Sequence, residues 1–277
     1  MNRLILAEVV KNALQEDIFS GDITSEAIFE TDFQARASFI AKSSGVAAGF
    51  PVVIAVFNHL DPKVVCYSKV PEGSQVAAGE IIGEVTGSIK AILSGERVAL
   101  NFLQRLSGIA TQTANLAKLI EGYPARIVDT RKTTPGLRIL EKYAVRQGGG
   151  LNHRFNLADA VLIKDNHIAA CGSIGEAVRR VRLRAPHTMR IEVEVENEAQ
   201  VCEALEAKAD IIMLDNMSVE EMTRMVGLIN HRAIVEASGN INETTIKNVA
   251  ATGVDIISVG SITHSVKALD ISLDIHQ

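Results

Sequence analysis

The sequence predicts an α/β fold whose C-terminal part is a β/α barrel. From about Ala125 onward, short β-branched runs alternate with helical patterns, at 125–129, 160–164, 190–194, 210–215, 233–238 and 254–260. This alternation is typical of parallel strands joined by helices. Most of the runs also end in a polar residue, namely Asp129, Lys164, Glu194, Asp215 and Ser238. In a barrel these strand ends converge on one mouth, whereas an open sheet would spread them out.

The remaining elements follow in order along the chain. An opening helix is expected over about 3–15, and segments 35–49 and 64–87 look like strands joined by glycine-containing turns. A long helical pattern over about 94–121 leads into the barrel. Ser173, Ser218 with Glu221, and Asn242 are candidate helix starts between the barrel strands. We expect an N-terminal α+β domain over 1–108 and a barrel domain over 109–265.

Composition limits the possible partners. The chain has 277 residues, a formal charge of −5 and 4% aromatic residues, which argues against a nucleic-acid surface. The first apolar run breaks at Glu8, too early for a signal peptide, and charges or glycines interrupt every later one. We therefore expect no membrane partner. Cys66, Cys171 and Cys202 are isolated, which fits a reducing compartment, so a cytoplasmic location is expected.

Cationic residues gather between positions 131 and 164. They are Arg131, Lys132, His153, Arg154 and Lys164, in a protein that is acidic overall. Like charges repel one another and are costly to desolvate, so this cluster indicates a pocket for an anion with several charges. A lone histidine is more often an ordinary packed or surface residue, which makes His153 the weakest member. Lys164 is stronger, because a lysine that closes an apolar strand must be paired or desolvated.

Carboxylates and small residues occupy the later strand ends. Glu194 and Asp215 end consecutive strands and offer the hard oxygen ligands that Mg²⁺ prefers. The segments 238–240 (Ser-Gly-Asn) and 259–261 (Val-Gly-Ser) could bring backbone N–H groups close to a phosphate. Each of these short segments is by itself a weak signal, because Ser-Gly is usually just a turn.

Several motifs together resemble the quinolinate phosphoribosyltransferase family, the carboxylating nicotinate-nucleotide pyrophosphorylases. The matching segments are 95–101 (GERVALN), 129–138 (DTRKTTPGLR), 149–154 (GGLNHR), 162–167 (LIKDNH), 192–196 (EVEVE), 213–216 (MLDN), 236–240 (EASGN) and 258–261 (SVGS). The resemblance runs from Glu16 to His264, with the motifs in the family's order. It implies an incomplete, open barrel with an N-terminal α+β sandwich, and residues 266–277 folding back onto that sandwich.

The resemblance also implies the reaction and the residues that carry it. Quinolinate would receive the phosphoribosyl group of 5-phosphoribosyl 1-pyrophosphate and lose CO₂, giving nicotinate mononucleotide and pyrophosphate in de novo NAD biosynthesis, with Mg²⁺ as cofactor. Lys132, Lys164, Glu194 and Asp215 would be catalytic, and Glu194 and Asp215 would hold the metal through the substrate. The implied substrate-binding residues are Arg97, Thr130, Arg131, Lys132, His153, Arg154, Lys164, Glu194, Asp215, Ser238, Gly239, Asn240, Val259, Gly260, Ser261 and His264. Arg97 would reach in from the neighbouring subunit of a homodimer.

Other functions stay open at this point. Lys164 at a barrel strand end could form a Schiff base, as in aldolases. Residues 71–85 resemble the strands of biotinyl and lipoyl carriers, but they lack the exposed lysine at a hairpin tip. Within the superfamily, the chain could act on nicotinate or be linked to molybdenum transport. Nicotinate has one carboxylate and would need fewer cations, so the cation set favours quinolinate.

Overall fold

Each of two units of the chain has its own sheet in the computed structural model, which describes residues 1–276. The N-terminal unit comprises Met1–Ala114, Thr133–Gly149 and the segment from Ile262 onward, and the barrel unit comprises Asn115–Lys132 and Gly150–Ser261. Among the described residues, no helix combines the length and the apolar character needed to cross a membrane.

The N-terminal unit contains an antiparallel sheet in the order β12-β1-β5-β3. Its strands are β1 (Gln34–Ala41), β3 (Val65–Ser68), β5 (Ile81–Ser88) and β12 (Ile271–His276), with a separate pair of β2 (Gly45–Val46) and β4 (Gln75–Val76). Its helices include α1 (Arg3–Ile18), α2 (Ile23–Ile28), α3 (Phe50–Leu60) and α5 (Arg138–Gln147). The C-terminal strand β12 lies antiparallel beside β1, with Phe39 opposite Leu273.

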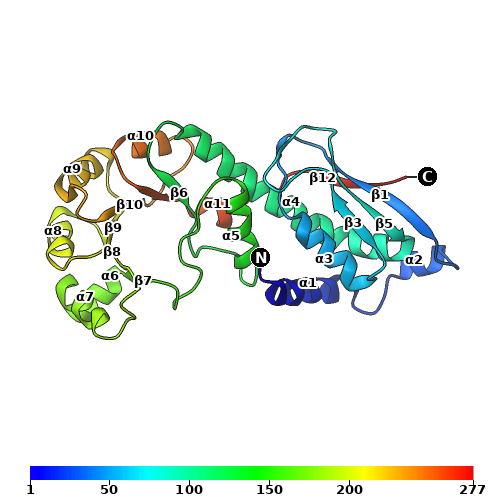
Figure 1. Cartoon of the computed structure of the whole chain (residues 1–277), viewed down its shortest axis with the longest axis horizontal. Coiled ribbons are helices and arrows are strands. Elements are labelled where there is room, and N and C mark those ends of the chain that lie inside the picture. The colour runs from blue at the N-terminus through cyan, green and yellow to red at the C-terminus, as the bar shows by residue number, and fades with distance from the viewer. Residues whose placement is uncertain (277) are drawn as a thin grey trace. The chain divides into compact units, whose positions relative to one another are not determined.

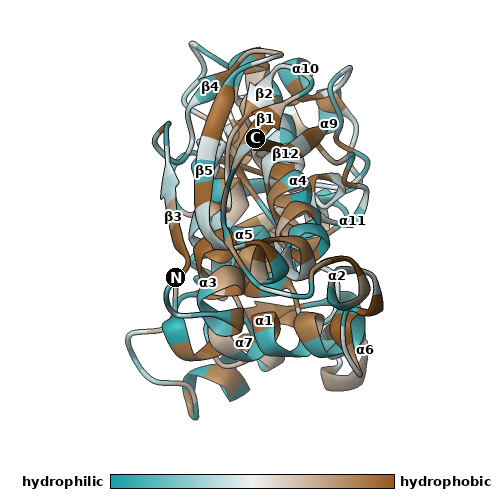
Figure 2. Ribbon diagram, turned by 90° about the vertical axis from the view of Figure 1, so that its right-hand side faces the viewer, coloured by the Kyte–Doolittle hydropathy of each residue, from teal (hydrophilic) through white to brown (hydrophobic). Residues whose placement is uncertain are grey.

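Aromatic packing joins helix α3 to this sheet. Phe39 of β1 meets Phe50 of α3 edge to face, with ring centroids 5.7 Å apart, and both rings are buried. Gly83 of β5 makes room for Phe50, because a Cβ on Gly83 would lie 2.0 Å from the Phe50 ring. Helix α1 buries one side through Leu6, Val10 and Leu14, and Figure 2 shows the alternation of hydrophobic and hydrophilic stretches along it.

The long helix α4 (Ile89–Leu119) begins five residues earlier than the sequence pattern predicts. Gly95 lies inside this helix, although glycine usually weakens a helix. Here it brings α4 close to α3: a Cβ on Gly95 would lie 2.8 Å from the Phe57 ring. The helix therefore runs through Gly95 rather than beginning beside it.

The barrel unit contains a parallel sheet in the order β6-β11-β10-β9-β8-β7. Its strands are β6 (Arg126–Val128), β7 (Val161–Ile163), β8 (Ile191–Val195), β9 (Ile211–Asp215), β10 (Ile234–Ser238) and β11 (Ile256–Ser258). Its helices include α6 (Asp165–Cys171), α7 (Ile174–Arg182), α8 (Glu198–Glu206), α9 (Val219–Ile229) and α10 (Ile246–Ala251). Figure 1 shows α7, α8, α9 and α10 along one face of the curved sheet. This arrangement confirms the predicted α/β class and the incomplete barrel.

Two of the three predicted helix starts in the barrel unit agree with the structure. Ser173 caps α7, and Ser218 with Glu221 forms the capping box of α9. The third prediction was wrong, because α10 begins at Ile246 and not after Asn242. The Asn242 side chain accepts a hydrogen bond from the backbone N–H of Thr244 instead. It closes a turn and leaves the helix to start four residues later.

Candidate active site

A cavity of about 600 Å³ opens at the carboxyl ends of the barrel strands. It lies entirely within the barrel unit. Its lining residues are Thr130, Arg131, Lys132, His153, Arg154, Leu162, Lys164, Glu194, Met213, Asp215, Asn216, Glu236, Ser238, Gly239, Asn240 and Ser258. The sequence singled out most of them in advance. The convergence of strand ends on one mouth is thus the feature that assembles the site.

Five of the predicted site residues do not line this cavity. Arg97 and His264 belong to the N-terminal unit. Val259 is buried, and its backbone N–H donates to the Val128 carbonyl, which ties β11 to β6. Gly260 and Ser261 follow it, and they also lie outside the cavity lining. Ser258, one residue earlier in the same segment, lines the cavity in their place.

A buried carboxylate positions the loop that carries His153 and Arg154. Asp129 is fully buried at the end of β6. Its carboxylate accepts hydrogen bonds from the Asn152 side chain at 2.6 Å and from the backbone N–H of His153 at 2.9 Å. Asp129 therefore holds this loop by charge-assisted hydrogen bonds, each about twice as strong as a neutral hydrogen bond.

The two guanidinium groups of the cavity lie near each other. Arg154 donates to the carbonyl of Ala160 at 3.0 Å. Burial, and then the charge of Arg131, lower the pKa of Arg154 below its ordinary value. Both effects disfavour the charged guanidinium, and a bound anion would relieve both. The pair is therefore poised to hold carboxylates through paired N–H donors.

Lys164 and Glu194 form an ion pair across the ends of β7 and β8. The Lys164 ammonium lies 3.0 Å from Glu194 Oε2, and the lysine side chain is 48% exposed. The Lys164 nitrogen is thus engaged by a carboxylate. This contact disfavours Schiff-base chemistry at Lys164, because that chemistry requires a free amine.

The residues that follow β9 and β10 pack against each other and line the cavity. Asn216 (φ 53°), Gly239 (φ 97°) and Asn240 (φ 53°) all have left-handed backbones. The backbone N–H of Asn216 donates to the Ser238 carbonyl at 3.0 Å, and its side chain donates to Asp215 at 2.7 Å. A Cβ on Gly239 would lie 2.2 Å from Asn216 Oδ1, so this position requires glycine.

Family models match both parts of the chain. The N-terminal domain of quinolinate phosphoribosyl transferase matches residues 22–107, and the C-terminal domain matches residues 109–274. The chain belongs to the quinolinate phosphoribosyltransferase family.

Individual relatives span nearly the whole chain. A probable nicotinate-nucleotide pyrophosphorylase [carboxylating] of Bacillus subtilis is 47% identical, covering 99% of this chain and 95% of that protein. The crystal structure of NadC from Streptococcus pyogenes has a TM-score of 0.95 at 45% identity, covering 100% and 99% of the two chains. The nicotinate-nucleotide pyrophosphorylase of Francisella tularensis has a TM-score of 0.95 at 42% identity, covering 100% and 98%.

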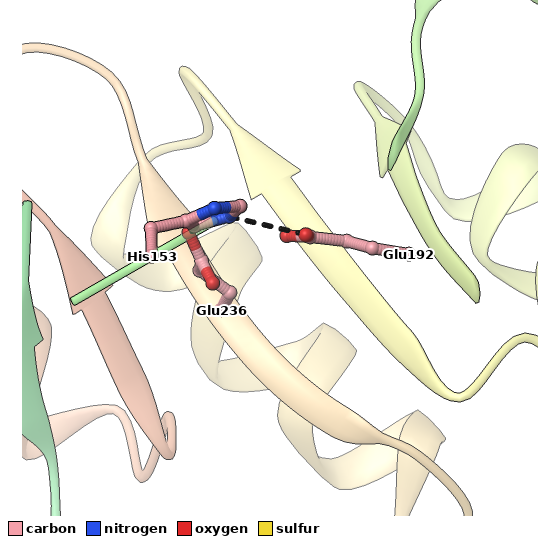
Figure 3. Close-up of side chains that lie close together, drawn as sticks. All are labelled: His153, Glu192 and Glu236. Carbon is pink, nitrogen blue, oxygen red and sulfur yellow. Dashed lines mark ion pairs between the residues drawn. The ribbon is translucent and has the colours of Figure 1, made fainter. Parts of the chain in front are cut away.

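Two buried glutamates beside His153 were not predicted as part of the site of this family member. Figure 3 shows His153 facing Glu192 of β8 and Glu236 of β10. His153 Nε2 lies 3.1 Å from Glu192 Oε2 and 3.7 Å from Glu236 Oε1. Both glutamates are 3% exposed. One indication of their role was present in the sequence: both glutamates lie within apolar strand runs, where an acidic residue must find a partner inside the fold.

The hydrogen bonds of His153 identify its tautomer. The backbone N–H of Arg154 donates to His153 Nδ1 at 2.7 Å. Nδ1 is therefore an acceptor, and the ring hydrogen is on Nε2, directed at Glu192. The sequence counted His153 among the cations of the pocket, whereas here it contributes a hydrogen bond to a buried carboxylate.

Proposed function

We propose that the barrel cavity transfers the phosphoribosyl group of 5-phosphoribosyl 1-pyrophosphate to the ring nitrogen of quinolinate. The product loses CO₂ to give nicotinate mononucleotide in de novo NAD biosynthesis, and pyrophosphate is released. The observation that carries the proposal is the meeting of Arg131, Lys132, Arg154 and Lys164 with Glu194 and Asp215 in one cavity. These are the charges that two polyanionic substrates and a metal ion require.

Arg131 and Arg154 would bind the two adjacent carboxylates of quinolinate. Their planar guanidinium groups match carboxylates as two-pronged donors. Burial and the charge of Arg131 lower the pKa of Arg154, which supports an anion site at this pair of guanidinium groups. Two carboxylates would offset the repulsion between the two guanidinium groups better than one, which favours quinolinate over nicotinate.

The other side of the cavity would hold the phosphoribosyl group. Asp215 and Glu194 would orient the ribose hydroxyls by accepting hydrogen bonds from them. Ser238, Gly239 and Asn240 supply a turn whose glycine leaves the backbone open to a phosphate. Val259, Gly260, Ser261 and His264 are proposed for the same phosphate from the resemblance alone.

Mg²⁺ is proposed as the cofactor, and Glu194 and Asp215 would hold it. The fit is supported by chemistry: both carboxylates border the cavity, and only part of their oxygen capacity is taken up by Lys164 and Asn216. Hard oxygen ligands and substrate phosphates are what this ion prefers. When bound, it would neutralise charge on the departing pyrophosphate.

The protein's own contribution to transfer is orientation and electrostatics. Attack of the ring nitrogen on the anomeric carbon passes through an oxocarbenium-like state, which nearby carboxylates such as Glu194 and Asp215 stabilise. Lys132 and Lys164 stabilise the negative charge that develops on the leaving group. Holding both substrates in line supplies much of the remaining acceleration, so no covalent nucleophile is needed.

A homodimer is proposed in which Arg97 completes the neighbouring subunit's site. Arg97 is exposed on α4, on a helix that supplies no residue to the cavity of the barrel unit. A cytoplasmic location is proposed from the three free, unpaired cysteines, because disulfides are rare in reducing compartments.

The function is tested by CO₂ release. Purified protein, Mg²⁺ and ring-carboxyl-labelled quinolinate should release labelled CO₂ only when phosphoribosyl pyrophosphate is added, with an equal amount of pyrophosphate. Nicotinate offered in place of quinolinate should give no comparable release of pyrophosphate. Turnover of nicotinate at an equal or higher rate would contradict the assignment of the substrate.

A further inference from the structure

The proposed reaction requires a proton donor, and none of the residue roles given so far supplies one. When the carboxylate next to the ring nitrogen departs as CO₂, an electron pair stays on the ring carbon. That carbon must receive a proton before the product can leave. We propose that Glu236 is the general acid of this step, and that its protonated carboxyl group delivers the proton that replaces CO₂ on the ring. This inference rests on the function proposed above.

Glu236 has the position that this role requires. It lies in the middle of β10, is 3% exposed, and borders the floor of the cavity. Its Oε1, like Oε1 of Glu192, has no hydrogen-bond partner among the described residues, and His153 Nε2 is 3.7 Å away; of the two glutamates, only Glu236 lines the cavity. A buried polar oxygen without a partner is rare in a folded protein and points to a functional use.

The surroundings of Glu236 keep it neutral. Glu192 faces it from β8, Ser258 from β11 and His153 from the loop after β6, while Met213, its register partner on β9, is apolar. His153 Nε2 lies 3.1 Å from Glu192 and 3.7 Å from Glu236, so Glu192 is the nearer partner of the ring and Glu236 is left with the weaker contact. Burial, and then the charge of Glu192, raise the pKa of Glu236 to about 8. Two such carboxylates cannot both ionise in one buried site, so Glu236 keeps its proton at neutral pH.

The same three residues have the ligand atoms of a metal site, since these atoms all lie within 4.8 Å of one another. The hydrogen bonds argue for a proton instead. A metal would need the lone pair of His153 Nε2, and metal-bound histidines donate their other N–H to a partner. Here Nδ1 accepts from the Arg154 N–H, so Nε2 carries the hydrogen. A proton, and not a metal ion, therefore lies between the ring and Glu192.

The step balances in atoms and charge. The bond between the ring carbon and the carboxylate breaks reversibly, and the electron pair stays on the carbon beside the positively charged ring nitrogen, so CO₂ is lost for good only when that carbon is protonated. This pair takes the proton of Glu236, and the electrons of the O–H bond stay on Glu236 as a carboxylate. Two buried negative charges then face each other, which favours the return of a proton from solvent before the next turnover.

The experiment measures pyrophosphate and CO₂ separately in the full-length protein with quinolinate, phosphoribosyl pyrophosphate and Mg²⁺. Wild-type protein should release them in equal amounts. Glu236→Gln keeps the side-chain volume and removes the acid, so its release of CO₂ should fall about 100-fold or more while pyrophosphate release falls far less. The mononucleotide that retains both carboxylates should accumulate. Glu220→Gln, the same substitution at an exposed position on α9, should behave as wild type.

A second measurement needs no variant. Glu236 must be protonated to act, and its pKa is raised, so the ratio of CO₂ to pyrophosphate should be constant below about 8 and fall as the pH rises through that value. Glu192→Gln removes the repelling charge and should move this fall to lower pH.

Each contrary result has its own meaning. If Glu236→Gln releases both products equally, or if the folded variant releases neither, Glu236 is not the acid of this step. A constant wild-type ratio across the pH range also refutes the proposal. A stoichiometric metal ion in the wild type that is lost in Glu236→Gln would assign the cluster to a cation. If the wild type releases neither product, the proposed function itself is refuted, and this step with it.

Discussion

The ammonium of Lys164 lies 3.0 Å from the carboxylate of Glu194 and joins the ends of two neighbouring barrel strands. The pair places a basic and an acidic side chain next to each other in the cavity, which Arg131, Arg154 and Asp215 also line. In the proposed function, an incoming polyanion would take Lys164 as a partner, and the carboxylate of Glu194 would turn to the ribose or to the metal. The ion pair thus orients both side chains before the substrates arrive.

Arg154→Ala should nearly abolish quinolinate binding and leave the fold intact. Removing one partner of a desolvated, charge-assisted pair costs roughly 2–5 kcal/mol of binding free energy. Titration calorimetry with quinolinate measures the loss, and circular dichroism checks the fold. Arg224→Ala is the matched control, because Arg224 is an exposed arginine on α9 outside the cavity lining. Unchanged quinolinate affinity in folded Arg154→Ala would remove Arg154 from the substrate site.

Asp215→Asn should lower turnover and weaken the dependence on Mg²⁺, with little change in quinolinate affinity. The two side chains have nearly the same volume, so packing changes little, whereas the negative charge is lost. The measurement compares turnover across a series of Mg²⁺ concentrations with the calorimetric affinity for quinolinate. A collapse of quinolinate affinity with an unchanged metal requirement would contradict the assignment of Asp215 to the ribose and the metal.

Gly239→Ala should reduce both stability and affinity for phosphoribosyl pyrophosphate. Its φ of 97° disfavours any side chain, and the added Cβ would lie 2.2 Å from Asn216 Oδ1. Backbone strain of this kind costs on the order of 1–3 kcal/mol, and the clash adds to it. Urea unfolding gives the free energy of unfolding for each variant.

Gly122→Ala separates the cost of backbone strain from the cost of the clash. Gly122 has a similar φ of 92°, and among the described residues an added Cβ meets no atom within 4 Å. This control should therefore show the backbone cost alone and normal activity. Equal losses of stability and activity in the two variants would show that the Gly239 turn has no special role in the site.

The barrel strands and most cavity residues were predictable because they depend on local patterns. A β-branched run followed by a polar residue, repeated along the chain, indicates both the strand and the end that faces the mouth. Glu192 and Glu236 could not be assigned in the same way. Their burial depends on each other and on His153, which is 39 residues from the first of them in sequence. The start of α10 was misplaced for a related reason, since Asn242 can cap a helix or close a turn with the same side chain.

Arg97 gives the prediction about assembly. If it enters the neighbouring subunit's cavity, Arg97→Ala and Lys164→Ala homodimers should each be inactive, because every site in them lacks one residue. Mixed dimers should regain activity: one of their two sites combines wild-type Arg97 with wild-type Lys164, and the other carries both defects. A two-fold dimer with two equivalent sites is the simplest assembly with this property.

Subunit exchange followed by the CO₂-release assay tests the shared site. At full exchange of equal amounts, half of the dimers are mixed and each has one intact site, so activity should reach about a quarter of the wild-type value. Mixing Arg154→Ala with Lys164→Ala is the control: both residues line the cavity of the same chain, so no exchange can restore a site. If native mass spectrometry shows mixed Arg97→Ala/Lys164→Ala dimers while activity stays at background, Arg97 does not act across the interface. Recovery in the control pair as well would mean that exchange rescues folding, since no intact site can form there.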